Sequence, residues 1–258
     1  MADNQHAKVR GWLNAPGRID KVGAAIRLAF DWVIDGPRTG RYSVDQLKTS
    51  EKIYLGNRVE HETLHLLQLP KSGLLDTEIE GIPVDVKFSL SHAWMIPPEA
   101  VNQLCLLMTA NDTDSTFRAG LLRMNPAWLS QGTGNRDSKR GILEIGREQI
   151  DWFSAVQPLP KNFLLHLDPV KRQRILAQSS GQKRINEVFR LCLNQPISTN
   201  TLDTLAIQRD PSKRIRDARK WLKPEGIEIL GERYDQARIR SLRLPPLAKD
   251  TWIAVKTS

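Results

Sequence analysis

Two aspartates and a lysine within residues 74–89 have the types and the spacing that metal-dependent phosphodiester chemistry requires. Asp76 lies in one short β-prone segment, and Asp85 and Lys87 lie in the next. Alternate residues of a strand share a face, so Asp85 and Lys87 should point the same way while their neighbours face the core. The turn signal Glu80-Gly81 predicts a hairpin that brings Asp76 alongside them.

This combination of groups suits the hydrolysis of a phosphodiester bond. Carboxylate oxygens are preferred ligands of Mg²⁺, which polarises the phosphate and stabilises the developing charge. A nearby lysine can orient or deprotonate the attacking water, or neutralise charge in the transition state. One acid followed by an acid-x-Lys is the pattern of PD-(D/E)xK nucleases, and it predicts a magnesium site at Asp76 and Asp85 with Lys87 beside it.

The pattern has a simpler interpretation, which is an ordinary ion pair on a strand. A second acid-x-Lys, Asp137-Ser138-Lys139, shows how readily the pattern arises. The settings differ, because Asp137 lies in a polar loop whereas Asp85 lies in a strand that reads as buried. A buried aspartate is costly unless a cation or hydrogen-bond donors satisfy it, and this favours a site at Asp85.

The surrounding segments predict a mixed sheet flanked by helices. Apolar residues about one turn apart predict a helix from Pro16 that ends at Gly36-Pro37, and a second helix with Ser43 as its N-cap. Residues 142–153 read as helical or mixed. The second helix and the strands that follow it span residues 44–67, 74–79, 82–90, 104–109 and 117–124.

A second domain should follow the proline-containing segment 157–160. Three helices and a pair of strands around the basic stretch 238–243 predict a winged helix-turn-helix. The expected domains are a flexible N-terminus at 1–15, a catalytic domain at 16–160 and a DNA-binding domain at 161–258. The elements of the last domain span residues 183–193, 201–207, 210–222, 227–230 and 252–255, with Asp210 as the N-cap of the third helix and Pro211 in its first turn.

The charge of the chain is concentrated in this second domain. The formal net charge is +9, and residues 166–258 hold 19 Lys/Arg against 10 Asp/Glu, a surplus of nine. Such asymmetry favours a nucleic-acid partner, or an anionic membrane, over a neutral one. The third helix carries five basic residues that could meet a major groove, although a solvated basic helix is the alternative: Lys213, Arg214, Arg216, Arg219 and Lys220.

Four stretches of the chain, one of them the segment with Asp76, Asp85 and Lys87, carry a family resemblance by their order and spacing. They are Asp45-Gln46-Leu47 with Glu51-Lys52, Leu75-Asp76 with Asp85-Val86-Lys87-Phe88-Ser89, Ile96-Pro97-Pro98-Glu99-Ala100, and Gly134-Asn135-Arg136-Asp137-Ser138-Lys139-Arg140. Residues from about Val44 to Trp152 thereby resemble the endonuclease domain of NaeI-type restriction enzymes, relatives of the MutH nicking endonuclease. The resemblance implies a restriction-endonuclease-like fold of the α+β or α/β class, followed by a mainly α winged-helix domain.

The resemblance also implies residue roles. Asp76 and Asp85 match the metal-binding acids and Lys87 the catalytic lysine, while a helical glutamate completes the set. Glu60 fits that last position by its distance from Asp76, and Glu62 is the rival, although either could be a solvated helix charge. The basic loop residues Arg136, Lys139 and Arg140 are expected to approach a phosphate backbone, with a solvated loop as the alternative.

The expected function is therefore sequence-specific cleavage of double-stranded DNA by Mg²⁺-dependent hydrolysis, as in a type II restriction endonuclease. Because a restriction site is usually palindromic, we expect a homodimer on DNA. The resemblance adds activation by a second, effector DNA site. A MutH-like nicking repair enzyme and a winged-helix regulator with an inactive nuclease domain are the alternatives. The chain has no signal peptide and no apolar run of about 18 residues, so we expect no membrane association and a bacterial cytoplasmic location.

Overall fold

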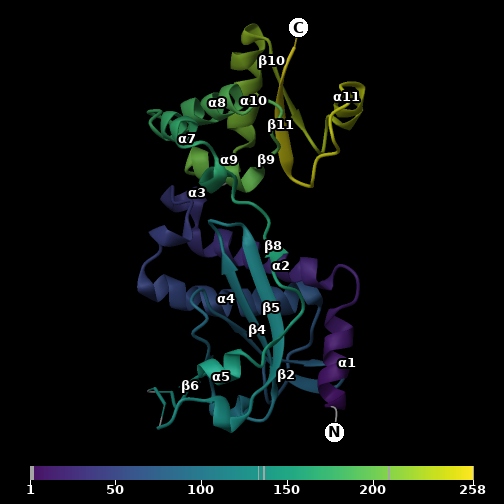
Figure 1. The fold of residues 1–258 in the computed structure, drawn as a ribbon. Helices are drawn as coiled ribbons and strands as arrows, with labels where there is room; N and C mark the ends of the chain where they lie inside the picture. The colour runs from purple at the N-terminus through teal and green to yellow at the C-terminus, as the bar shows by residue number, and fades with distance from the viewer. Residues whose placement is uncertain (1–2, 133, 136, 209, 258) are drawn as a thin grey trace. The chain divides into compact units, whose positions relative to one another are not determined.

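The protein folds into two compact units. The computed structural model describes residues 3–132, 134–135, 137–208 and 210–257 (Figure 1). The first unit comprises residues 1–33 and 47–161, and the second comprises residues 34–46 and 162–258. Residues 34–46, which were expected in the catalytic domain, cluster with the second unit.

A mixed six-stranded sheet forms the centre of the first unit. The strand order is β1-β2-β4-β5-β7, with β8 also paired to β5. Strands β2 and β4 run parallel, and every other pair in this sheet is antiparallel. The strands are β1 (Thr77–Ile79), β2 (Ile82–Phe88), β4 (Leu104–Asn111), β5 (Thr116–Arg123), β7 (Asp151–Trp152) and β8 (Gln157–Pro158).

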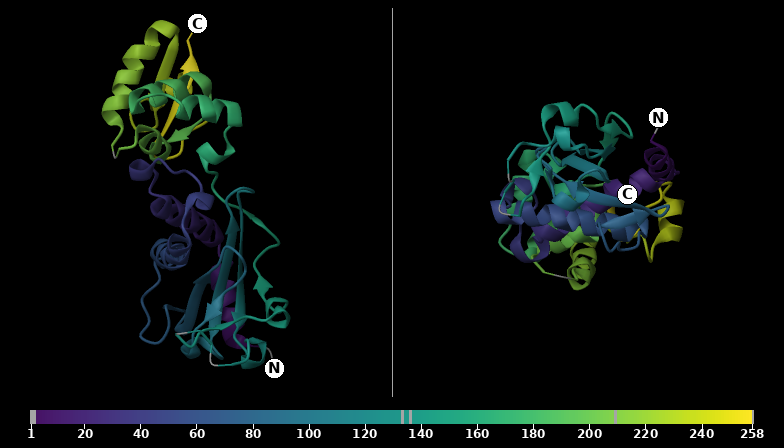
Figure 2. Two further views of the ribbon diagram at one scale, coloured as in Figure 1. Left: turned by 90° about the vertical axis from the view of Figure 1, so that its left-hand side faces the viewer. Right: turned by 90° about the horizontal axis from the view of Figure 1, so that it is seen from below.

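Both faces of the sheet are covered, because successive side chains of each strand point to opposite faces and most of those on β4 and β5 are buried. Figure 2 shows α2 (Arg18–Ile34) and α4 (Thr49–Leu67) on one face and the segment with α5 (Glu144–Arg147) on the other. On the helical face Phe30 of α2 packs edge-on against Phe88, with ring centroids 5.9 Å apart. The opposite face buries a separate cluster that includes Cys105, Leu107 and Trp94. The predicted mixed sheet flanked by helices is confirmed.

Three short elements complete the first unit. Helix α1 (Asn4–Leu13) begins with the Asp3 side chain accepting a hydrogen bond from the His6 N–H. Strands β3 (Met95–Ile96) and β6 (Arg140–Gly141) pair with each other. The expectation of a flexible residue 1–15 segment is wrong for α1, because Val9 and Leu13 are buried and Arg123 of β5 forms an ion pair with Asp3.

The second unit places helices against a three-stranded antiparallel sheet of order β10-β11-β9. One apolar cluster lies between α8, α9, α10 and the sheet, and a smaller one joins the sheet to α11. The elements are α3 (Gly36–Thr39), α6 (Phe163–His166), α7 (Pro169–Leu176), α8 (Gly181–Leu191), β9 (Ile197–Ser198), α9 (Thr199–Ala206), α10 (Ser212–Leu222), β10 (Ile227–Gly231), α11 (Gln236–Ser241) and β11 (Thr251–Lys256).

Three local details differ from the sequence-based expectations. Ser43 is not the N-cap of α4: its hydroxyl accepts from the Asp45 N–H in a 3-10 turn, and α4 begins at Thr49. Asp210 is not the N-cap of α10, since Pro211 occupies that position and Asp210 instead accepts from the Ser212 N–H. The basic stretch 238–243, expected between two strands, overlaps helix α11, which spans Gln236–Ser241. Among the described residues, no helix is long and apolar enough to cross a membrane.

Candidate active site

A tight hairpin positions the two aspartates. Strands β1 and β2 pair in register from Ile79↔Ile82 to Thr77↔Val84, and both turn residues, Glu80 and Gly81, have positive φ. A two-residue turn with positive φ at both positions matches the twist of the flanking strands. The predicted turn is confirmed, and it carries Asp76 back beside the second half of β2, where its Oδ2 accepts from the Val86 N–H at 2.8 Å.

Lys87 lies at the centre of the cluster. Its Nζ is 2.9 Å from Asp85 Oδ1 and 3.1 Å from Asp76 Oδ2, and it also lies 3.0 Å from the Val86 carbonyl oxygen. Asp85 is almost completely buried, and its neighbour across the parallel pair is Cys105 of β4. The structure therefore brings together the three residues that the sequence singled out.

A third carboxylate approaches from α4. Glu60 Oε1 lies 3.9 Å from Lys87 Nζ, so the helix contributes its acid to the same cluster. Glu62 instead forms an ion pair with Arg58 one turn earlier on α4, and Arg58 stacks on the ring of Trp32. Of the two glutamates between which the sequence could not decide, only Glu60 lies beside Lys87.

The electrostatics of the cluster are set by burial and by its excess of carboxylates. Burial raises the pKa of Glu60 to about 7, against the attraction of Lys87. Burial also raises the pKa of Asp85, and the neighbouring Asp76 adds to this. For Asp76, burial opposes ionisation, but Lys87 and the Val86 N–H outweigh it and hold the pKa below its usual value. The three acids likewise hold the pKa of Lys87 above its usual range, despite burial.

The three carboxylates of the cluster carry more negative charge than the single ammonium group of Lys87 can neutralise, as in a site for an additional cation. Three carboxylates surround one ammonium group, and Asp85 Oδ2 is buried without a hydrogen-bond donor among the described residues. Oxygen donors of this kind suit Mg²⁺. Within the described part of the chain no three acidic, histidine or cysteine side chains already converge as a metal shell, because Lys87 stands between the carboxylates.

Comparison with known proteins places the chain among DNA-cleaving enzymes. Residues 14–258 match the family described as restriction endonuclease NaeI. The chain is also 36% identical over 249 residues to the type II restriction enzyme NaeI of Lentzea aerocolonigenes, a match that covers 92% of this chain and 78% of that enzyme. The chain belongs to the NaeI restriction endonuclease family.

Membership of the NaeI family confirms the resemblance that the sequence motifs indicated. It also confirms the expected class, a site-specific endonuclease of a restriction-modification system, and the acids and lysine of the cluster all lie within the matched residues. Type II restriction endonucleases generally use Mg²⁺. A cluster of buried carboxylates with an unsatisfied oxygen is consistent with that requirement.

The basic loop of this NaeI-family chain is only partly described. Arg136 lies outside the described residues. Lys139 is close enough for its charge to oppose the rise in the pKa of Glu60, and Arg140 lies in β6 opposite Ile96. The Asn135 side chain accepts from the backbone N–H groups of Asp137 and Lys139, which fixes the local path of the loop.

The five basic residues of α10 differ in exposure and in side-chain partners. Lys213, Arg216 and Lys220 are exposed and follow one another at intervals of three and four residues, so they share one face. Arg219 pairs with Asp235 and lies over Trp252, whereas Arg214 donates to the side chain of Gln208. The sequence analysis missed these internal contacts of Arg219 and Arg214, since both partners lie outside the helix.

Proposed function

We propose that this protein cleaves double-stranded DNA at specific sites by Mg²⁺-dependent hydrolysis in the Asp76, Asp85, Lys87 and Glu60 cluster. The observation that carries this proposal is the convergence on Lys87 of three carboxylates, from Asp76 just before β1, from Asp85 in β2 and from Glu60 in α4. Family membership supports the enzyme class, and all four residues of the cluster lie within the matched residues 14–258.

Asp76, Asp85 and Glu60 are the residues that would hold the metal. When bound, Mg²⁺ polarises the phosphodiester and stabilises the negative charge that develops on it. The buried Oδ2 of Asp85 supplies an oxygen that no described donor occupies. Burial raises the pKa of both Glu60 and Asp85, so a bound cation would stabilise their ionised forms.

Lys87 has a role of its own. The acids hold its pKa above the usual range, so its Nζ keeps its protons at neutral pH. A protonated lysine donates hydrogen bonds and stabilises charge, and it cannot accept a proton from water. Beside the proposed metal ligands, Lys87 would act on the attacking water or neutralise charge that develops in the transition state.

The second unit is proposed to be a winged-helix DNA-binding domain. Support comes from α8, α9 and α10 packed on the β10-β11-β9 sheet, and from the exposed basic face of α10. Lys213, Arg216 and Lys220 would meet DNA, together with Lys139 and Arg140 of the first unit. Arg214 and Arg219 would mainly hold α10 in place through their side-chain partners.

Two further properties belong to the same proposal. A palindromic site is most simply read by a two-fold protein, so we propose a homodimer that cuts one strand with each subunit. The basic second unit would bind a second copy of the site as effector DNA. A restriction role also implies a bacterial cytoplasmic location, where foreign DNA is met.

Incubation of the full-length protein with plasmid DNA and Mg²⁺ tests the proposed function. Site-specific cleavage of both strands gives discrete linear bands. Nicked circles would indicate a nicking enzyme, and a mobility shift without cleavage would indicate a DNA-binding regulator. A chelator in a parallel reaction removes the metal and should abolish the bands without abolishing binding.

A further inference from the structure

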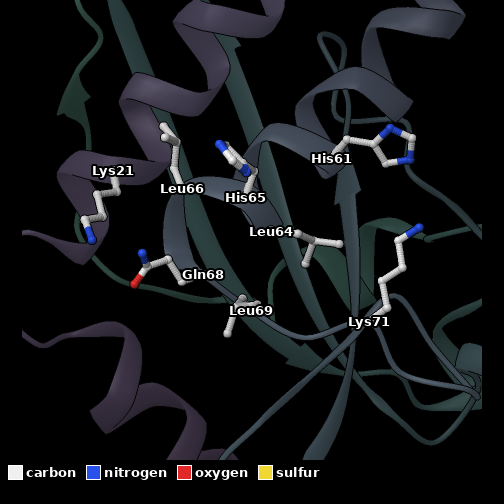
Figure 3. Close-up of a pocket in the computed structure, with 8 residues that line it drawn as sticks. All are labelled: Lys21, His61, Leu64, His65, Leu66, Gln68, Leu69 and Lys71. Carbon is white, nitrogen blue, oxygen red and sulfur yellow. The ribbon is translucent and has the colours of Figure 1, made fainter.

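A cationic groove lies beside the cluster within the first unit. Its volume is about 710 Å³, and it is formed by α2, the last turns of α4 and the turn that follows (Figure 3). The residues that line it are Lys21, His61, Leu64, His65, Leu66, Gln68, Leu69 and Lys71. Its lining therefore combines apolar side chains with hydrogen-bond donors.

The formally charged side chains that line the groove are both lysines, Lys21 and Lys71. In Figure 3 the amino groups of Lys21 and Lys71 lie on opposite sides, with the leucines between them and the two imidazoles on α4. No acidic residue is among those that line the groove, and neither lysine forms an ion pair with a described carboxylate. A concave surface with two unneutralised ammonium groups favours an anionic ligand.

Residues that line the groove are next to residues of the candidate active site in the sequence or in backbone pairing. His61 directly follows Glu60 on α4. Lys71 forms an isolated β-bridge with Thr77, the residue that follows Asp76. Glu60 is thus followed by a residue that lines the groove, and Asp76 is followed by a residue that pairs with one.

We propose that this groove binds a backbone phosphate that flanks the scissile phosphodiester, with Lys21 and Lys71 as its principal contacts. The inference rests on the proposed function, because that function places a duplex at the cluster. Phosphate contacts fix the register of a protein on DNA and carry no base information. The groove would accordingly position the scissile bond over the acids and leave the choice of sequence to other residues.

The test measures how DNA affinity depends on salt. A protein that neutralises phosphates releases counterions, so each phosphate contact contributes about 0.9 to the slope of log K against log salt concentration. Full-length Lys21→Gln with Lys71→Gln should lower this slope by about two in a chelator-containing buffer. The matched control, Lys8→Gln with Lys52→Gln, removes two exposed lysines that lie outside the groove and should leave the slope unchanged.

The outcomes separate the groove from the cleavage site. Since binding is measured without metal, Asp85→Asn should keep the wild-type slope even though it abolishes cleavage. An unchanged slope in the groove variant, with an unchanged melting temperature, would overturn the proposal. A second arm titrates inorganic phosphate into the DNA-free protein. Phosphate binding lost in the groove variant, together with an unchanged DNA slope, would likewise overturn it and assign the groove to a small phosphate ligand.

Discussion

Glu60 and Glu62 lie on the same helix two residues apart, but their surroundings differ. Glu60 reaches Lys87, whereas Glu62 is neutralised by Arg58. Glu60→Gln should therefore reduce single-turnover cleavage by at least about 100-fold, because it removes a proposed metal ligand. Glu62→Gln is the matched substitution and should retain most activity. Equal losses in the two variants would show that Glu60 has no special role.

The acid–base state of the cluster predicts how its metal requirement depends on pH. Protonation competes with metal binding, and the pKa of Glu60 is raised to about 7 while that of Asp85 is raised as well. As pH falls through 7 these carboxylates take up protons, so the Mg²⁺ concentration for half-maximal cleavage should rise. Titrations of Mg²⁺ at pH 6, 7 and 8 measure this. A requirement that falls toward acidic pH would contradict the assignment of these acids as ligands.

The residues of this cluster show which features of a site can be predicted from sequence and which cannot. Strand alternation was sufficient to place Asp85 and Lys87 on one face, and the turn at Glu80-Gly81 brought Asp76 to them. Helix spacing could not choose between Glu60 and Glu62, because the answer depends on where Arg58 and Lys87 lie in three dimensions. The cationic groove was equally hidden, since its lysines come from segments fifty residues apart.

Helix α10 offers a test at the level of an element, since its basic residues divide into exposed and tethered groups. Replacement of Lys213, Arg216 and Lys220 by Gln should lower the salt slope of DNA binding by up to about three and leave thermal stability unchanged. Arg219→Ala should instead lower the free energy of unfolding by about 1 kcal/mol, because it removes the ion pair with Asp235. Denaturant unfolding and DNA-binding titrations separate the two effects; loss of stability in the triple variant would contradict the division.

Element types were easier to predict than element ends. The long amphipathic helices and the paired strands arise from apolar periodicity, which the chain displays directly. Helix starts depend on which side chain reaches which N–H group: Ser43 and Asp210 both accept local hydrogen bonds, but outside the helices they were expected to cap. Helix α1 escaped prediction because much of its stabilisation comes from tertiary contacts with β5.

For the whole molecule, the central question is why a nuclease carries a second unit with an excess of basic residues. If that unit binds effector DNA, its affinity must differ between the active and inactive conformations. A one-site plasmid should then be cut more slowly than a two-site plasmid, and an added short duplex carrying the site should accelerate its cleavage. The variant with Lys213, Arg216 and Lys220 replaced should lose that acceleration. Equal rates on both plasmids, unaffected by added duplex, would mean that the unit merely grips the DNA that is cut.

The existence of two units could be anticipated from charge and from the prolines near residue 160, but their exact membership could not. Residues 34–46 pack with the second unit, where α3 contacts α9 and the Tyr42 carbonyl accepts from the Asn162 side chain. Little in the local sequence indicates that an early segment packs with a later domain, because this packing depends on complementary surfaces rather than on composition.

The most direct test of the proposed chemistry is single-turnover cleavage of a cognate duplex by the wild type, Asp85→Asn, Lys87→Met and Asp137→Asn at saturating Mg²⁺. Asp85 and Lys87 lie in the cluster, whereas Asp137 belongs to the acid-x-Lys of the loop and serves as the control. We predict that Asp85→Asn and Lys87→Met lose cleavage by at least about 100-fold with DNA affinity largely retained, while Asp137→Asn keeps its cleavage rate. Wild-type-like cleavage by Asp85→Asn or Lys87→Met would contradict the assignment of this cluster as the active site.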